Sequence, residues 1–330
     1  MEDKLLEVKD IVTEFKTKKG AIRAVDGVSF FVRHGELLGV VGESGSGKSL
    51  TSLSIMGLLP YPGKVTSGEI LFEGKDLLKL DERKINEMRG KYLSMIFQDS
   101  MVSLDPVYKC GDQIIEAIML HRKVTRKEAR NIALELLNMV GIPHPQRYME
   151  AYPHELSGGM CQRIMICIAL SCRPKLLIAD EPTTALDVTV QAQILDLLNR
   201  LRRELNMSVI LITHDLGVVA GVADRVAVMY AGQIVELGDV DKIFNNPKHP
   251  YTKGLMRSMP QLHVNYKRLY SISGTVPTLD NMPEGCRFAQ RCPECMDICN
   301  NIQPDMLVTE DGYCLRCHKY SDDPEVKGCG

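Results

Sequence analysis

The sequence has 330 residues, of which 45% are hydrophobic and 25% charged, a balance that excludes disordered and fibrous proteins. Forty Lys and Arg residues face 42 Asp and Glu residues, and a net charge of −2 argues against a protein that binds a polyanion. The longest apolar run, residues 164–170, is far shorter than the roughly 18 residues of a membrane span, and no secretory signal is visible, so we expect a cytosolic protein.

The first predicted strands lie at residues 5–8, 28–32 and 37–41. The third is continuously apolar, as expected of a buried central strand, and it leads directly into glycines. The next eight residues, from Gly42 to Ser49, read G-E-S-G-S-G-K-S and fit the pattern G-x-x-x-x-G-K-[ST]. Because a helix is predicted at 50–59, this pattern lies in the strand-to-helix context that a phosphate-binding loop requires.

The chemistry of this loop points to a nucleoside triphosphate. Its glycines let successive N–H groups face phosphate oxygens, and the helix N-terminus adds a partial positive charge. We expect Lys48 to reach the β- and γ-phosphates and the Ser49 hydroxyl to coordinate Mg²⁺. The residues expected to bind ATP in this loop are Gly42, Ser44, Gly45, Ser46, Gly47, Lys48 and Ser49.

From about residue 81 to 141 the pattern becomes helical, with apolar stripes at 114–119 and 129–140. The basic residues at 121–127 are expected to form a solvated helix face. Further on, helices are predicted at 160–171 and 188–205, strands at 175–179 and 208–212, and a hairpin at 225–230 and 233–237. This alternation is typical of a mainly parallel sheet covered by helices.

Two carboxylate residues follow directly after the predicted strand at 175–179. Asp180 is placed to hold Mg²⁺, and Glu181 to orient and polarise an attacking water molecule. An acidic pair is also common as a simple strand cap. The phosphate loop upstream is what favours phosphoryl transfer here.

The segment Leu156-Ser157-Gly158-Gly159-Met160 resembles the signature of ABC-type ATPases, and it stands just before the Asp180-Glu181 strand, as in that family. The resemblance implies an α/β P-loop NTPase fold over residues 1–258. This fold has a RecA-like, mainly parallel sheet, an antiparallel β subdomain and a helical subdomain at about 100–155.

The resemblance also implies roles for individual residues. Ser157, Gly158 and Gly159 would close over a γ-phosphate held by a partner subunit. Gln98 would touch Mg²⁺ and the attacking water, and His214 the γ-phosphate, so that the catalytic group is Glu181, His214, Gln98 and Lys48. Phe15 would stack on adenine, and the loop Ala185-Leu186-Asp187 would cross the dimer interface.

A narrower resemblance covers nearly the whole chain. His249-Pro250-Tyr251-Thr252, then Gly274 and Pro277, then the cysteine-rich tail are similar to the ATP-binding subunits of dipeptide, oligopeptide and nickel importers. It implies a heterodimer with a second ATPase, bound at the cytoplasmic face of the membrane to two permease subunits that receive cargo from an extracytoplasmic binding protein. The alternative is a DNA-repair ABC ATPase with a zinc module, which the neutral net charge opposes.

Seven of the eleven cysteines fall within the last 45 residues, so residues 259–330 are predicted to form a cysteine-rich extension that binds a metal. The spacing of Cys292, Cys295, Cys314 and Cys317 fits zinc. The set Cys286, Cys292, Cys299 and Cys317 is similar to the importer tail that can carry a [4Fe–4S] cluster, and this set is the favoured hypothesis. Cys161, Cys167 and Cys172 are expected to be small core residues.

Overall fold

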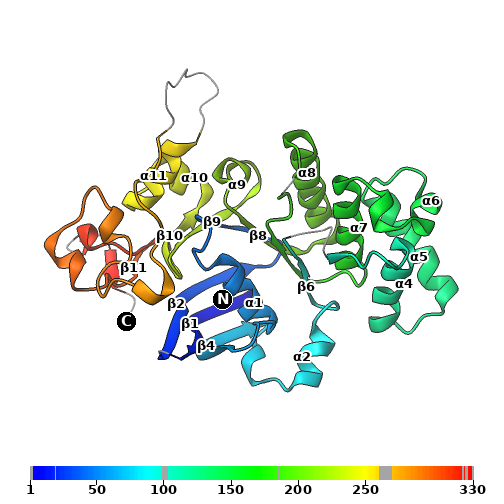
Figure 1. The fold of residues 1–330 in the computed structure, drawn as a ribbon, viewed down its shortest axis with the longest axis horizontal. Helices are drawn as coiled ribbons and strands as arrows, with labels where there is room; N and C mark the ends of the chain where they lie inside the picture. Colours follow the sequence, from blue (N-terminus) through cyan, green and yellow to red (C-terminus); the bar gives the residue numbers. More distant parts are fainter. Residues whose placement is uncertain are drawn as a thin grey trace. The chain divides into compact units, whose positions relative to one another are not determined.

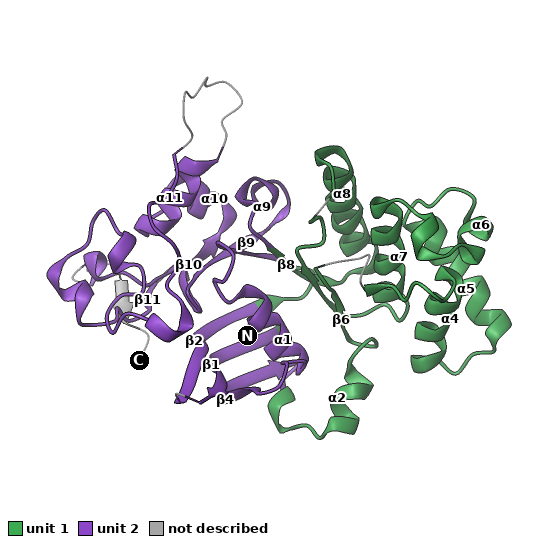
Figure 2. Ribbon diagram, viewed as in Figure 1, with its two compact units in different colours: residues 1–5, 32–36, 76–212 green, residues 6–31, 37–75, 213–330 purple. Residues whose placement is uncertain are grey.

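The computed structural model describes residues 3–18, 20–98, 103–184, 186–259, 270–321, 323 and 326–328 (Figure 1). The chain divides into two compact units (Figure 2). Unit 1 comprises residues 1–5, 32–36 and 76–212, and unit 2 comprises residues 6–31, 37–75 and 213–330. Ala185, in the loop predicted to cross a dimer interface, lies outside the described residues.

Unit 1 contains a buried parallel sheet. Its strands are ordered β8 (Ser208–Thr213), β7 (Leu176–Asp180) and β6 (Leu93–Ile96), and all their residues are buried. The sequence predicted β7 and β8, but β6 lies within the stretch expected to be helical. The four residues of β6, which include the polar Ser94, are too few to show a strand period. Its strand conformation is fixed by parallel pairing with β7, in which Leu93 faces Leu176.

Helices make up the rest of unit 1. On α7, Cys161 and Cys167 are fully buried as predicted, whereas Cys172, beyond the helix, is partly exposed. Lys123 and Lys127 are exposed, as predicted, but Lys123 lies in the non-helical segment 122–125 and not on a helix face. The helices are α2 (Glu82–Met88), α4 (Cys110–His121), α5 (Arg126–Met139), α6 (Pro145–Glu150), α7 (Gly158–Leu170) and α8 (Val188–Leu205), with short 3-10 turns at Leu77–Lys79 and Pro153–Glu155.

Unit 2 contains most of an antiparallel sheet, ordered β2-β1-β4-β5, and a mixed sheet, ordered β13-β11-β12-β10-β9-β3. In the mixed sheet β3 and β9 are parallel, and β9 and β10 form the hairpin predicted from the sequence. The strands are β1 (Lys4–Thr17), β2 (Gly20–Arg33), β3 (Leu37–Val41), β4 (Gly63–Phe72), β5 (Lys75–Asp76), β9 (Arg225–Tyr230), β10 (Gln233–Asp239), β11 (Leu307–Thr309), β12 (Cys314–Leu315) and β13 (Val326–Gly328).

The cysteine-rich extension is packed on the rest of unit 2. Strand β12 pairs with β10, so that Leu315 faces Glu236. The ring of Phe288 lies 5.1 Å from that of Tyr230 and 5.3 Å from that of Tyr251, between ring centroids. The helices of unit 2 are α1 (Lys48–Met56), α9 (Leu216–Val222), α10 (Val240–Asn245) and α11 (Pro250–Ser258), with 3-10 turns at Leu279–Asn281, Ala289–Arg291, Asp297–Asn300 and His318–Tyr320.

Candidate functional site

The predicted phosphate loop connects β3 to α1 in unit 2. A Cβ atom on Gly42 would lie 2.2 Å from the carbonyl oxygen of Met229, so no larger residue fits there. Gly47 adopts φ +97° as the N-cap of α1, and a Cβ atom would lie 3.0 Å from Gly232 Cα. These two glycines allow the loop to curl around the N-terminus of α1, whose partial positive charge favours an anion.

Lys48 is drawn into this loop. Its side chain is only 5% exposed, and Nζ donates to Gly42 O at 2.8 Å, to Glu43 O at 3.0 Å and to Ser46 Oγ at 3.4 Å. A buried ammonium group needs such partners to offset its lost hydration. The structure therefore places a fixed positive charge in the loop, where the sequence predicted a phosphate ligand.

Two further predicted residues also belong to unit 2. Phe15 on β1 faces Gly63 on β4, and a Cβ atom on Gly63 would lie 2.8 Å from the Phe15 ring, so the ring lies across that glycine. His214 is exposed and lies just before Asp215, the N-cap of α9. The N-terminus of α9 is fixed by Asp215, whose Oδ1 accepts from Gly217 N–H at 2.8 Å.

Unit 1 brings the predicted catalytic carboxylate and glutamine together. Gln98 Nε2 donates to Glu181 Oε2 at 3.0 Å, and the same oxygen accepts from Thr184 Oγ1 at 3.0 Å. Glu181 has φ +45° and donates its N–H to Ile212 O at 2.9 Å, which fixes the turn after β7. Asp180, the last residue of β7, is 4% exposed.

Thr184 was missed from the sequence. The sequence signal that could have indicated its contact with Glu181 was a hydroxyl residue three positions after that carboxylate.

The signature segment begins α7, also in unit 1. Ser157 is the N-cap, but its exposed side chain makes no capping hydrogen bond. Gly158 and Gly159 form the first turn, and Cβ atoms on them would lie 3.2 Å from Leu186 Cδ2 and 2.8 Å from Val190 Cγ1. A hydroxyl beside the free N–H groups of a 13-residue helix is suited to bind an anion.

Comparison with known proteins shows which family this chain resembles. The ABC transporter family matches residues 25–184, and the oligopeptide/dipeptide transporter C-terminal region matches residues 235–299. The oligopeptide transport ATP-binding protein AppD of Bacillus subtilis (strain 168) is 54% identical over 97% of this chain and 98% of its own. The chain belongs to the ABC transporter ATP-binding proteins of the oligopeptide/dipeptide type.

Other relatives support the assignment. The dipeptide transport ATP-binding protein DppD of Escherichia coli (strain K12) is 49% identical over 97% of this chain and 98% of its own. A dimeric ATP-binding cassette, MJ0796, solved with ADP and Pi, is 27% identical with a TM-score of 0.65, covering 71% of this chain and 98% of its own. The chain is therefore an ABC-type ATPase with the α/β P-loop NTPase fold, as predicted, and the DNA-repair alternative is not supported.

The prediction of a [4Fe–4S] cluster is wrong. The four proposed ligands, Cys286, Cys292, Cys299 and Cys317, are all described, yet no three His, Cys, Asp or Glu side chains in the described part of the chain are grouped to hold a metal ion. The same holds for the zinc set of Cys292, Cys295, Cys314 and Cys317, whose members are also all described.

The described contacts between the extension and the rest of unit 2 include aromatic packing and strand pairing. Aromatic packing around Phe288 and the pairing of β12 with β10 attach it to unit 2. The spacing of the cysteines alone could not distinguish a metal-bound extension from one attached by aromatic packing and strand pairing.

Proposed function

We propose that this chain is the ATP-hydrolysing subunit of an importer for dipeptides or oligopeptides. Two relatives that match it over 97% of its length are named as oligopeptide and dipeptide transport ATP-binding proteins. The single observation that carries the proposal is that similarity extends through the C-terminal region, at residues 235–299, beyond the part common to ABC transporters. We retain residues 1–258 as the nucleotide-binding part and residues 259–330 as an extension.

The nucleotide chemistry is proposed as follows. The N–H groups of the loop at 42–49 and the Lys48 ammonium group bind the phosphates of ATP, and Phe15 stacks on adenine. The Ser49 hydroxyl, the Gln98 amide oxygen and the Asp180 carboxylate are oxygen donors of the kind Mg²⁺ prefers, and the ion would neutralise charge on the β- and γ-phosphates.

Hydrolysis itself needs a positioned water molecule. Glu181 accepts a proton from this water as its oxygen attacks the γ-phosphorus, and the bond to the ADP oxygen breaks. The hydrogen bond from Gln98 supports this role, because it fixes the carboxylate. His214 contacts the γ-phosphate.

We further propose that each ATP is completed by a second ATPase subunit, in a heterodimer. Ser157, Gly158 and Gly159 at the start of α7 would bind the γ-phosphate of the partner's nucleotide. A dimeric cassette among the solved structures of similar fold supports this arrangement.

Membrane attachment is proposed to be indirect. No helix among the described residues has the length and apolar character needed to cross a bilayer. Two permease subunits would bind the helical region at about 100–155 and hold the chain at the cytoplasmic face, and an extracytoplasmic binding protein would deliver the peptide. Partly exposed apolar side chains in this region, such as Tyr108 and Leu120, support such a contact.

The test is transport by the assembled complex in lipid vesicles. With Glu181→Gln, peptide uptake and ATP turnover should fall together by about 10²–10⁴-fold, while ATP is still bound. Glu204→Gln, at an exposed carboxylate on α8 that pairs with Arg200, is the matched control and should transport normally. ATP turnover that peptide never stimulates would refute the peptide cargo. Unchanged turnover in Glu181→Gln would refute the catalytic assignment.

A further inference from the structure

An acidic residue lies within the phosphate loop. Glu43 and Lys48 are the charged residues among positions 42–49, and a carboxylate beside a site for phosphates should repel ATP. In the structure Glu43 is bound by Arg291 of the extension, 248 positions further along the chain. Arg291 Nη1 donates to Glu43 Oε2 at 2.7 Å, and Nη2 donates to Glu43 Oε1 at 2.9 Å. This two-pronged geometry is the strongest form of an ion pair between side chains.

Arg291 is itself firmly held. Its side chain is 5% exposed, Nε donates to Ser273 O at 2.9 Å, and Nη1 also donates to Tyr230 Oη at 3.3 Å. The guanidinium group lies 5.6 Å from the centroid of the Tyr230 ring. Hydrogen bonds to Glu43 raise the pKa of Arg291 further above its usual range, so the positive charge is permanent.

The backbone at Glu43 is fixed from the same side of the fold. Its N–H donates to Tyr251 Oη at 2.9 Å, and the Tyr251 ring packs against Tyr230 with centroids 4.7 Å apart. Both the charge and the backbone of this loop position therefore depend on residues that follow the hairpin of β9 and β10.

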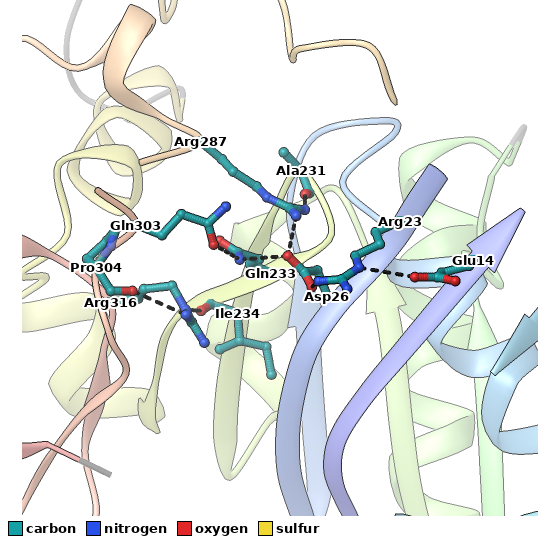
Figure 3. Close-up of polar contacts among 10 residues, drawn as sticks. All are labelled: Glu14, Arg23, Asp26, Ala231, Gln233, Ile234, Arg287, Gln303, Pro304 and Arg316. Atoms are coloured by element: carbon teal, nitrogen blue, oxygen red, sulfur yellow. Dashed lines mark hydrogen bonds and ion pairs between the residues drawn. The ribbon is translucent and has the colours of Figure 1, made fainter. Parts of the chain in front are cut away.

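A second arginine of the extension, Arg287, binds beside the turn at Ala231 (Figure 3). Arg287 donates to the carbonyl oxygen of Ala231 and pairs with Asp26. The next residue, Gly232, donates its N–H to Ser46 O in the phosphate loop at 2.8 Å. The extension thus contacts the loop directly through Arg291 and, through Arg287, the turn on which the loop rests.

We propose that Arg291 is a positioning residue of the ATP site, which neutralises Glu43 and thereby allows this loop to bind the phosphates of ATP. The C-terminal extension is then part of the nucleotide site rather than an accessory to cargo handling. The proposal rests on ATP binding by the loop and is independent of what the transporter carries.

The experiment measures the affinity of the full chain for a fluorescent ATP analogue, with ATP as competitor. Arg291→Gln leaves Glu43 charged and unpaired, so the dissociation constant should rise about tenfold at low salt. Because this repulsion is screened, the loss should shrink as ionic strength rises. In the Arg291→Gln background, Glu43→Gln should restore most of the affinity, since it removes the uncompensated charge. Arg291→Lys should retain more affinity than Arg291→Gln because it keeps the positive charge.

Lys319→Gln is the matched control, because it removes another ion pair of the extension, with Glu294, and should leave ATP affinity unchanged. The thermal unfolding midpoint of each variant identifies a simple loss of fold. Equal affinity in Arg291→Gln and the parent would overturn the proposal. Two other results would also overturn it, because a purely structural role of Arg291 predicts them. One is a loss of ATP affinity in the double variant that equals the sum of the two single losses, and the other is a loss that does not depend on salt.

Discussion

Gln98 Nε2 donates a 3.0 Å hydrogen bond to Glu181 Oε2, across 83 positions of sequence within unit 1. From the sequence we expect both residues to act on the attacking water, and Gln98 also to touch Mg²⁺. Because the two side chains are in direct contact, a movement of Gln98 would also change the position of the Glu181 carboxylate, the group proposed to activate water.

Replacing Gln98 with Ala should therefore lower kcat for ATP hydrolysis in the assembled complex by about tenfold, the loss of one hydrogen bond to a charged group. The KM for ATP should change less than kcat, because the phosphate loop is untouched and Ser49 and Asp180 remain as proposed Mg²⁺ ligands. Steady-state kinetics separates the two constants. A raised KM with unchanged kcat would show that Gln98 serves binding instead.

Gly42→Ala should disrupt the phosphate loop, because the new Cβ would lie 2.2 Å from Met229 O and 2.7 Å from Ser46 Oγ. Overpacking of this kind costs about 1–3 kcal/mol of unfolding free energy, and ATP binding should be lost with it. Gly221→Ala, in α9 with nothing within 4 Å, is the control and should be neutral or stabilising. Urea unfolding and nucleotide binding measure both effects, and a Gly42→Ala variant that binds ATP normally would contradict the loop geometry.

Stability should depend on pH through His249. Burial lowers its pKa to about 3, below the usual 6.5, and Nδ1 accepts from Tyr251 N–H at 3.0 Å. A lowered pKa in the folded state gives stability that is complete above pH 6.5 and is lost as pH falls toward 3. At pH 5 the loss should reach about 2 kcal/mol.

The variant His249→Asn keeps a residue able to cap α11, but this residue does not titrate. Its unfolding free energy should be lower than that of the parent at pH 7. The difference should shrink toward pH 5, because only the parent loses stability as His249 is protonated. Urea unfolding across this range gives the difference directly. Contributions common to both proteins, such as that of the nearby buried Glu236, cancel. A difference that stays constant with pH would exclude His249 as its source.

Ser157→Arg should prevent closure of the ATPase dimer. A long cation at the exposed N-cap of α7 would fill the space proposed for the partner's γ-phosphate, while the chain's own loop still binds ATP. Size-exclusion chromatography with ATP in a Glu181→Gln background should show loss of the trapped dimer and retention of nucleotide. A dimer that persists would remove Ser157 from the proposed interface.

Local signals in the sequence were reliable. The span 188–205 predicted for α8 matches the structure, and the hairpin at Ala231-Gly232 and the loop before Lys48 were also correct. Strand β6 was missed because its four residues, one of them the polar Ser94, carry no measurable period.

Distant relationships were not accessible from the sequence. Arg291 is an unremarkable basic residue until folding brings it to Glu43, and the cysteine spacing suggested ligands whose side chains do not form a metal-binding group among the described residues. Spacing along the chain constrains neighbours within an element, whereas convergence of loops depends on packing that spacing does not encode.

The ion pair between Glu43 and Arg291 has a consequence for biosynthesis. A ribosome delivers the phosphate loop early, but its partners Tyr251 and Arg291 emerge 208 and 248 positions later. Closing so long a segment is slow compared with forming a local turn. The nascent polypeptide should consequently reach its full affinity for nucleotide only after Arg291 has been synthesised and has folded onto the loop.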